Sequence, residues 1–328
     1  MRGAFKLQLN VLGLVSIDTL IFDGNTSYLG GGALATAWTA SLWEVPTVLY
    51  SISCESSCKE VLDRNLLCNK FFSHIILSKD KLMTRFEISI YNEEYKYTIS
   101  NMSPCHDELC HFLNITTGEQ YVKLPADNFA ALTDKIDNVS INPQGRFSLL
   151  DFAKGTQTKG FIFLNKKELL MAFKQDFQTS LKYIENLQQS FVITLGEDGS
   201  ICYCAENAKW YFCPSILSVN CVSSLGCGDS FAGGFLAARV KQYSIADCMI
   251  YGTISAYLVT LSANNMVTFW LDDILNTSSF EDLKVAIRCF DSNEEVMNFL
   301  QTYNCKSVVL KKKPPMSRRF DWILSNGV

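Results

Sequence analysis

Residues 225–235 read Leu-Gly-Cys-Gly-Asp-Ser-Phe-Ala-Gly-Gly-Phe. Two glycines around one small residue let the backbone turn tightly, and the apolar residues that follow, Phe231, Phe235 and Ala238, recur at helical spacing. The stretch therefore predicts a loop that leads directly into the N-terminus of a helix.

The first turn of such a helix has unpaired N–H groups and the positive end of the helix dipole, so it can bind an anion such as a phosphate. Gly226, Cys227 and Gly228 would supply these amides. Asp229 would stay ionised beside them and could take a proton from an attacking hydroxyl. A plain tight turn with an acid in the first helical turn has the same pattern, so the stretch alone leaves both interpretations open.

The stretch resembles the Gly-Ala-Gly-Asp signature of the ribokinase-like (PfkB-type) carbohydrate and nucleoside kinases. In that family the aspartate is the catalytic base and the preceding amides form the anion hole, which gives those roles to Asp229 and to Gly226, Cys227 and Gly228. Cys227 replaces the usual alanine. Ser223-Ser224 stand where the family has Asp-Thr, so the resemblance does not carry over a monovalent-cation site.

Strand-like and helix-like patterns alternate along most of the chain, which predicts an α/β fold. The resemblance makes this expectation specific: one domain over residues 1–328, a doubly wound three-layer sandwich with a mostly parallel central sheet. The same resemblance implies a small β lid formed by about residues 19–28 and 84–101. Residues 84–100 alternate between apolar and polar side chains on both sides of a polar turn, so they predict a hairpin.

The substrate side of the expected site comes from the first third of the chain. Residues 9–15 predict a buried strand that ends near Ser16 and Asp18. The resemblance makes Asp18 the ligand of substrate hydroxyls, and it places Gly31 and Gly32 close to the substrate. The family asparagine that would bond to the sugar is Ala35 in this chain, so the identity of the substrate does not carry over.

The nucleotide side comes from two further segments. Asn165-Lys166-Lys167-Glu168 follows a predicted strand and resembles the family motif Asn-x-x-Glu, which implies that Asn165 and Glu168 hold Mg²⁺ and that Asn165 also contacts ATP. Taken alone, these four residues are a helix cap. Residues 194–199 resemble the family run Thr-Leu-Gly-x-x-Gly, so we expect Thr194 and Gly196 to bind ATP.

Composition limits the partners and the compartment. The net charge of −4 argues against nucleic acid as a partner, because a phosphate-binding surface needs clustered lysine and arginine. No stretch reaches the roughly 20 apolar residues of a membrane span, so no membrane partner is expected. Thirteen scattered cysteines indicate reduced thiols and a cytoplasmic protein. A homodimer through the lid stays open.

The cluster Cys105-His106-Asp107-Glu108-Leu109-Cys110-His111 has metal-binding residue types but not the spacing of a zinc site. A surface turn with a short helix is the favoured interpretation of this segment.

Together these patterns predict an enzyme that uses ATP and Mg²⁺ to phosphorylate a hydroxyl of a small sugar or nucleoside. The alternative is a catalytically silent relative that binds a metabolite or a protein partner. The residues at positions 35, 223 and 224 motivate this alternative, because they depart from the family pattern near the expected site.

Overall fold

The structure is a computed structural model of the chain. It describes residues 8–51, 56–66, 69, 72–76, 83–91, 94–101, 119–123, 139–143, 159–217, 221–262, 264, 266–268, 279–303, 308–309 and 322–324. The cluster at residues 105–111 lies outside these described residues, so its interpretation stays a prediction.

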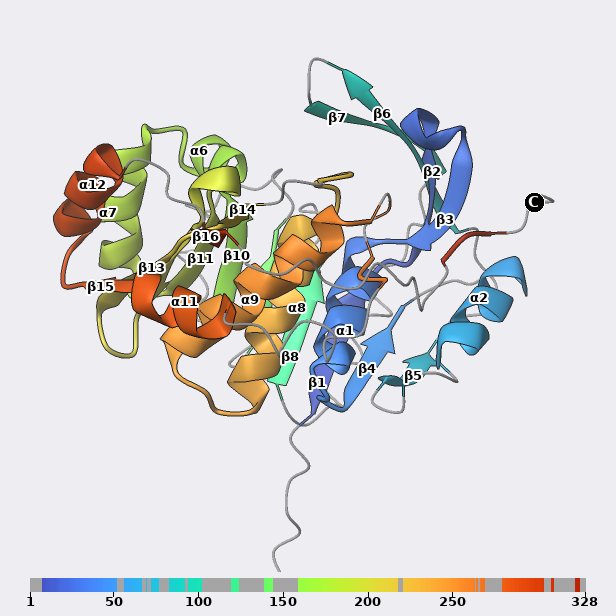
Figure 1. The fold of residues 1–328 in the computed structure, drawn as a ribbon, viewed down its shortest axis with the longest axis horizontal. Coiled ribbons are helices and arrows are strands. Elements are labelled where there is room, and N and C mark those ends of the chain that lie inside the picture. Colours follow the sequence, from blue (N-terminus) through green and yellow to red (C-terminus); the bar gives the residue numbers. More distant parts are fainter. Residues whose placement is uncertain are drawn as a thin grey trace, which may run out of the picture.

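A ten-stranded mixed sheet runs through the molecule in the order β15-β13-β12-β11-β10-β9-β8-β1-β4-β5 (Figure 1). Seven neighbouring strands are parallel and lie at the β5 end of this order. They are β1 (Leu9–Gly13), β4 (Thr47–Tyr50), β5 (Phe72–Ile76), β8 (Glu119–Lys123), β9 (Val139–Asn142), β10 (Phe161–Asn165) and β11 (Ser190–Thr194). The antiparallel strands β12 (Ser200–Cys204), β13 (Lys209–Cys213) and β15 (Arg288–Phe290) complete the sheet.

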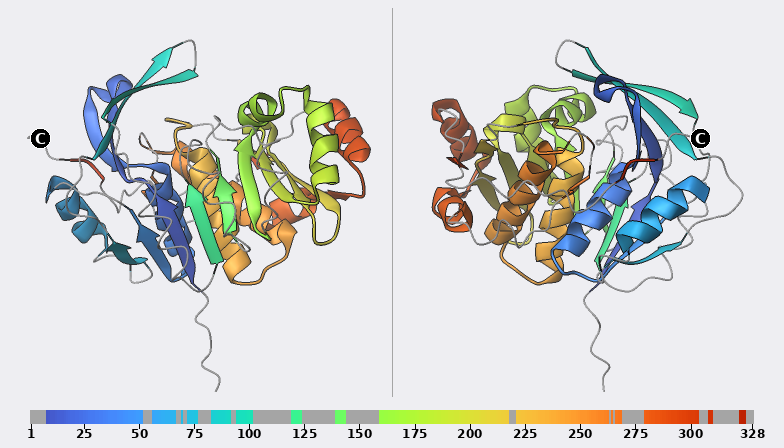
Figure 2. Two further views of the ribbon diagram at one scale, coloured as in Figure 1. Left: turned by 180° about the vertical axis from the view of Figure 1, so that it is seen from behind. Right: turned by 45° about the vertical axis from the view of Figure 1, so that its right-hand side comes forward.

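Helices cover both faces of this sheet, because the side chains of its strands alternate between two apolar cores (Figures 1 and 2). Phe161 and Phe163 point into one core, whereas Ile162 and Leu164 point into the other. The first core also contains α1 (Gly32–Leu42), α2 (Ser56–Leu66), α8 (Cys227–Val240), α9 (Ile245–Thr260) and α11 (Ser279–Ala286). The second contains α6 (Lys166–Phe173), α7 (Phe177–Leu187) and α12 (Asn293–Thr302). The predicted three-layer α/β fold is therefore confirmed.

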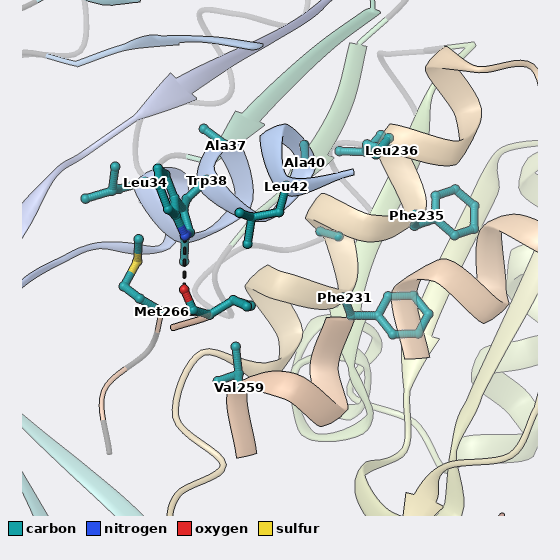
Figure 3. Close-up of a cluster of buried hydrophobic side chains, with 14 of the residues drawn as sticks. Leu34, Ala37, Trp38, Ala40, Leu42, Phe231, Phe235, Leu236, Val259 and Met266 are labelled. Carbon is teal, nitrogen blue, oxygen red and sulfur yellow. Dashed lines mark hydrogen bonds between the residues drawn. The ribbon is translucent and has the colours of Figure 1, made fainter. Parts of the chain in front are cut away.

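The helices α1 and α8 pack closely in the first core (Figure 3). Gly233 makes this approach possible, since a Cβ atom there would lie 2.8 Å from the Cβ of Thr39 on α1. Trp38 of α1 donates an indole hydrogen bond of 3.0 Å to the backbone carbonyl of Val267, as Figure 3 shows. This packing fixes the N-terminus of α8 relative to α1 and to the sheet beneath both.

A separate four-stranded sheet, which we call the small sheet, has the order β3-β2-β6-β7 and rises beyond the edge of the main sheet (Figure 1). Its strands are β2 (Ser16–Leu20), β3 (Thr26–Gly30), β6 (Thr84–Tyr91) and β7 (Glu94–Asn101). The predicted hairpin is the β6–β7 pair, in which Ile88 faces Tyr97 and Ile90 faces Tyr95. A short 3-10 helix, η1 (Ile21–Asp23), connects β2 to β3.

The structure corrects the sequence expectation for residues 9–18. The first strand ends at Gly13, and Ser16–Leu20 is a second strand that belongs to the small sheet. Asp18 therefore lies inside a strand of the small sheet and not at the carboxyl end of a strand of the main sheet. Apolar residues continue from β1 into β2, so the sequence does not mark the point near Leu14 where the chain leaves the main sheet.

A segment near the end of the chain pairs with the small sheet. Leu29 N–H donates to the carbonyl of Trp322 at 2.9 Å, and Leu324 N–H donates to the carbonyl of Ser27 at 2.9 Å. Trp322 is 1% exposed and packs edge-on against Trp38 of α1 with 4.9 Å between the ring centroids. The segment thus joins β3 to the core of the molecule.

Two short strands, β14 (Ile216–Leu217) and β16 (Val308–Val309), form a further parallel pair. A second 3-10 helix, η4 (Gly196–Asp198), follows β11. None of the helices among the described residues has the length and apolar character needed to cross a membrane.

Candidate active site

The candidate site lies at the carboxyl ends of the parallel strands, where side chains from several strands meet. Lys123 at the end of β8 is in register with Gly13 of β1 and with Asn142 of β9. Further along the same sheet, Asn165 at the end of β10 is in register with Thr194 of β11. The N-terminus of α8 is held at this edge by the contact between Asp229 and Lys123.

The first turn of α8 has the conformation that its glycines predict. Gly226 is the N-cap residue with φ of 78°, a left-handed conformation that favours glycine. The N–H of Cys227 donates to the carbonyl of Ser224 at 3.3 Å, so this amide takes part in the turn. Among the described residues, no acceptor binds the N–H groups of Gly226, Gly228 and Asp229. Of the three amides expected to bind an anion, those of Gly226 and Gly228 are thus without an acceptor among the described residues, whereas that of Cys227 is bonded. The amide of Asp229 is a further one without an acceptor there.

The space beside this turn is open. A Cβ atom built on Gly228 would have no atom within 4 Å. The Cys227 thiol points away from this space, since its Sγ donates to the carbonyl of Ala256 on α9 at 3.5 Å. A helix start with unpartnered amides and free space beside it fits a bound anion.

Asp229 forms an ion pair with Lys123, a residue that the sequence patterns did not mark. The side chains of Lys123 and Asp229 are 9% and 15% exposed, so the pair is largely buried. Gly32, at the start of α1, lies against both partners: a Cβ there would meet the end of Lys123 and would come within 2.7 Å of Asp229 Oδ2. Gly32 therefore lies beside the candidate base.

Asp18 of β2 is 5% exposed, and its carboxylate is held by two hydrogen bonds. Ser16 Oγ donates to Asp18 Oδ1 at 2.6 Å, and the backbone N–H of Gly31 is the second donor. Burial raises the pKa of Asp18 to about 6, the two hydrogen bonds lower it, and the negative charge of Asp229 raises it further. Asp18, Gly31, Gly32 and Asp229 thus form one cluster of predicted residues.

Gly31 shapes the entry to α1 in this cluster. Its φ is 100°, and a Cβ there would lie 2.6 Å from the carbonyl oxygen of Leu14. Ala35, in the next turn of α1, is fully buried in the first core. An asparagine at position 35 would therefore have to be accommodated within packed side chains.

Asn165 and Glu168 form a capping box at the start of α6. Glu168 N–H donates to Asn165 Oδ1 at 2.8 Å, and Asn165 N–H donates to Glu168 Oε2 at 2.8 Å. The interpretation of this motif as a helix cap is therefore confirmed. Burial and the charge of Asp229 raise the pKa of Glu168, whereas the backbone bond and Lys123 lower it, so Glu168 lies within electrostatic reach of the base.

Thr194 ends β11, and Gly196 opens the 3-10 helix η4. Gly196 has φ of 69°, and a Cβ there would meet nothing within 4 Å, so its backbone borders open space. Thr194 lies beside Asn165 across the β10–β11 pair. In the described part of the chain, no hydrogen bond or ion pair joins Thr194 or Gly196 to the cluster around Asp229.

The small sheet contacts the loop before α8 through Tyr95. The Tyr95 hydroxyl lies 2.7 Å from Ser223 Oγ and accepts the backbone N–H of Ser224 at 2.9 Å. Tyr97, on the same face of β7, lies close enough to the site for the charges of Asp229 and Asp18 to act on its hydroxyl. The face of the small sheet that carries these two tyrosines therefore points toward the site.

Sequence reasoning missed Lys123 because nothing in its neighbourhood marks it. It ends a five-residue strand, and its partner Asp229 lies 106 positions later. Its place at the carboxyl end of a parallel strand was the available signal. Tyr95 was placed on the hairpin, but its bonds to Ser223 and Ser224 depend on how the small sheet sits over α8.

No group of three or more histidine, cysteine, aspartate or glutamate side chains is placed to hold a metal ion in the part of the chain that the structure describes.

Residues 128–268 match the family model described as pfkB family carbohydrate kinase. In sequence, the chain is 34% identical over 89 residues to 5-dehydro-2-deoxygluconokinase of Geobacillus kaustophilus, a match that covers 27% of this chain and 26% of that enzyme. It is 32% identical over 104 residues to a nucleoside kinase of Methanocaldococcus jannaschii, covering 30% and 32% of the two chains. The matched sequence thus spans about a quarter to a third of these relatives.

The fold match is much longer. The crystal structure of the Methanocaldococcus jannaschii nucleoside kinase, described as an archaeal member of the ribokinase family, has a TM-score of 0.64 and 18% identity, covering 84% of this chain and 98% of that one. Arabidopsis thaliana ribokinase, solved with ribose and ATP, has a TM-score of 0.61 and 13% identity, covering 90% and 99%. Residues 128–268 thus match the pfkB family carbohydrate kinase model, and most of the chain shares its fold with these two kinases.

Proposed function

We propose that this protein is a kinase that transfers the γ-phosphate of ATP to a hydroxyl group of a small sugar or nucleoside. One observation carries the proposal: Asp229 lies in the first turn of α8 beside three backbone amides that have no acceptor among the described residues. The names of the relatives support it, since they are sugar and nucleoside kinases.

In this reaction Asp229 accepts the proton of the acceptor hydroxyl as its oxygen attacks the γ-phosphorus. The bond between the γ-phosphorus and the bridging oxygen breaks, and ADP leaves with that oxygen. The amides of Gly226, Gly228 and Asp229 donate to the oxygens of the transferring group, where negative charge is concentrated. Because these donors are fixed by the fold of the turn, they need no rearrangement during the transfer.

Asp18 would hold the acceptor substrate through hydrogen bonds from its hydroxyl groups. Ser16 and the Gly31 amide already fix the orientation of the Asp18 carboxylate. Its proximity to Asp229 would place one substrate hydroxyl at the base and others at Asp18. Thr194, the last residue of β11, and Gly196, the first residue of η4, would contact ATP.

Mg²⁺ fits this site through Glu168. Its Oε2 is used in the capping box, but its Oε1 accepts no hydrogen bond from the described part of the chain. A free carboxylate oxygen of this kind binds Mg²⁺ directly or through its water ligands, and the metal would neutralise charge on the phosphates. Asn165, whose Oδ1 accepts the Glu168 amide, would mainly fix the position of Glu168.

The small sheet would act as a lid over the acceptor substrate. Its strands carry exposed apolar residues, including Ile90 (49%), Tyr97 (53%) and Ile99 (40%), that a bound substrate or a second copy of the chain would cover. A lid that excludes water would prevent hydrolysis of ATP at the site.

Replacing Asp229 by Asn tests the proposal. We expect kcat to fall about 10²- to 10⁴-fold, the usual contribution of a general base, while ATP affinity and the fold are retained. Turnover would be measured as ADP formed with a panel of sugars and nucleosides, and ATP affinity by calorimetry. The matched control is Asp247→Asn, since Asp247 occupies the same third position of α9 that Asp229 occupies in α8. Equal turnover in Asp229→Asn and wild type would refute the proposed role, and ADP formation with no member of the panel would favour a non-catalytic binding protein.

A further inference from the structure

Lys123 is a buried cation that contacts the candidate base. Its side chain reaches from the end of β8 to Asp229 Oδ1, and 9% of it is exposed. In the described part of the chain, Asp229 has no other ion-pair partner. Gly32 at the start of α1 borders both members of the pair, and a Cβ there would meet the end of the lysine side chain. The ammonium group thus lies in space that position 32 leaves free.

This ion pair has to open before Asp229 can act as a base. The ammonium group occupies the carboxylate that the acceptor hydroxyl must reach, so the hydroxyl has to replace Lys123 Nζ there. A buried ammonium group that loses its counter-ion is strongly destabilised unless another anion accepts its hydrogen bonds. Lys123 therefore has to turn to an anion that lies close to Asp229.

Two carboxylates near the pair have other tasks in the proposed reaction. Asp18 is held by two hydrogen bonds of its own and would bind the substrate hydroxyls. Glu168, which lies within electrostatic reach of Lys123, uses Oε2 in the capping box and would offer Oε1 to Mg²⁺. The γ-phosphate of ATP is the third anion, and it arrives together with the substrates.

The γ-phosphate would also be in the right place for Lys123. The backbone amide of Asp229 is one of the three that would bind the transferring group, and the carboxylate of the same residue is the one that Lys123 contacts. The ammonium group therefore lies within one residue of the expected phosphate position. Its three N–H donors allow it to bind a phosphate oxygen as it leaves the carboxylate.

We infer that Lys123 is a catalytic residue that moves from Asp229 to the transferring phosphoryl group. The inference rests on the proposed kinase function of the same site. The ammonium group keeps its own protons and donates hydrogen bonds to a non-bridging oxygen of that group, which stabilises the negative charge during transfer. The proton of the acceptor hydroxyl goes to Asp229, which the departure of Lys123 has freed.

The binding test uses Asp229→Asn, because this substitution frees Lys123 from its partner and slows turnover. It is compared with the double variant Asp229→Asn/Lys123→Met, which should fold because both charges of the buried pair are removed together. Affinities for ATP and ADP with Mg²⁺ are measured by calorimetry. We expect the double variant to bind ATP about tenfold or more weakly than Asp229→Asn, with a change of less than about threefold for ADP.

The matched control is Lys209→Met in the same Asp229→Asn background. Lys209 also pairs with an aspartate, Asp291, at 3.3 Å, but both side chains are largely exposed. This control should leave both nucleotide affinities unchanged. Because Asp229 carries no charge in this background, a loss of ATP affinity confined to the Lys123 variant cannot come from repulsion between the γ-phosphate and an unpaired Asp229.

The turnover test uses Lys123→Met and Lys123→Arg with Asp229 intact, and turnover is measured as ADP formed. We expect Lys123→Met to lower kcat by about 10²-fold, as for the loss of one donor to the transferring group, with little change in the KM of the acceptor. Lys123→Arg retains the charge and should recover a large part of kcat. If Lys123→Met does not fold, the double variant and Lys123→Arg decide the question.

The outcomes separate this inference from the kinase proposal. Unchanged ATP affinity in the double variant, or equal losses for ATP and ADP, would overturn the inference, because Lys123 would then serve only the neighbouring carboxylates. A higher KM of the acceptor with unchanged kcat in Lys123→Met would also overturn it, because Lys123 would then bind the acceptor. In either case, ADP formation by wild type would leave the kinase proposal in place. A loss confined to ATP, in a protein that phosphorylates no acceptor of the panel, would support the contact with the γ-phosphate and contradict the kinase proposal.

Discussion

Asp18 is a buried acid whose ionisation should control substrate binding. In its proposed role the ionised carboxylate accepts hydrogen bonds from substrate hydroxyls at both oxygens, which protonation weakens, and its pKa of about 6 is close to neutral pH. We expect acceptor affinity to be constant above pH 7 and to fall about tenfold between pH 7 and pH 5, since one proton blocks binding. Calorimetric titration of a productive acceptor across this range measures the effect. Asp18→Asn is the control, with weak binding that does not change with pH; a wild-type affinity that also stays constant would show that Asp18 does not bind the acceptor.

The same group should make stability depend on pH. Burial raises the pKa of Asp18 from 3.8 in the unfolded chain to about 6 in the fold, so the folded state binds the proton more tightly. The fold therefore loses stability as pH rises from about 4 to about 6, by on the order of 3 kcal/mol over the full window.

Urea unfolding of wild type and Asp18→Asn isolates this effect, because the variant lacks the ionisable group. The difference in unfolding free energy between them should shift in favour of Asp18→Asn by roughly 1 kcal/mol between pH 5 and pH 8, the part of the window that is accessible above pH 5. A difference that stays constant with pH would show that Asp18 has an ordinary pKa.

Individual site residues differed in how far the sequence could predict them. Asp18, Gly31, Gly32 and Asp229 were expected from their motifs, and the structure brings them into one cluster. Lys123 was not expected, because a single lysine that follows two apolar residues is common at the end of a strand. Lys123 meets Asp229 because β8 lies next to β1 in the sheet, which brings the end of β8 close to the start of α8. No local sequence pattern encodes this order of strands.

At the scale of elements, the β6–β7 hairpin is tied to the loop before α8 by the Tyr95 hydroxyl. We expect Tyr95→Phe to lose the bonds to Ser223 and Ser224, to destabilise the protein by about 1 kcal/mol and to raise the KM of the acceptor several-fold, with a smaller effect on the KM of ATP. Steady-state kinetics with each substrate varied in turn measure this. Tyr91→Phe is the matched control, because Tyr91 lies on the same hairpin and is 67% exposed. Equal effects of both substitutions, or a rise confined to ATP, would mean that the hydroxyl does not position the small sheet over the acceptor.

Strands and helices with strong periodicity were predicted well, and the boundaries between sheets were not. The β6–β7 hairpin follows its alternation, and α8 follows its apolar spacing. The change from β1 to β2 was missed because residues of both strands are buried, so no polar residue marks the point where the chain leaves one sheet for the other. Burial on both faces removes the alternation that separates strands in sequence.

At the scale of the whole molecule, residues 322–324 connect the small sheet to the main core. Trp322→Ala should destabilise the fold by about 3–5 kcal/mol, because a fully buried indole is lost and a cavity forms beside Trp38. The control is Ile323→Ala, since Ile323 is 36% exposed and should change stability by much less. Thermal and urea unfolding measure both variants. Similar losses in the two would show that the indole contributes no more than its exposed neighbour.

The pairing of residues 322–324 with β3 also bears on the order of folding during synthesis. Ser27 and Leu29 emerge from the ribosome early, but their hydrogen-bond partners are made almost three hundred residues later. Such a distant contact costs loop-closure entropy and forms late, so the strands that carry Asp18 remain incomplete at their outer edge until residue 324 has been translated. A growing chain would therefore build the helices and parallel strands of the main sheet first and gain the capacity to bind an acceptor only as synthesis of this segment ends.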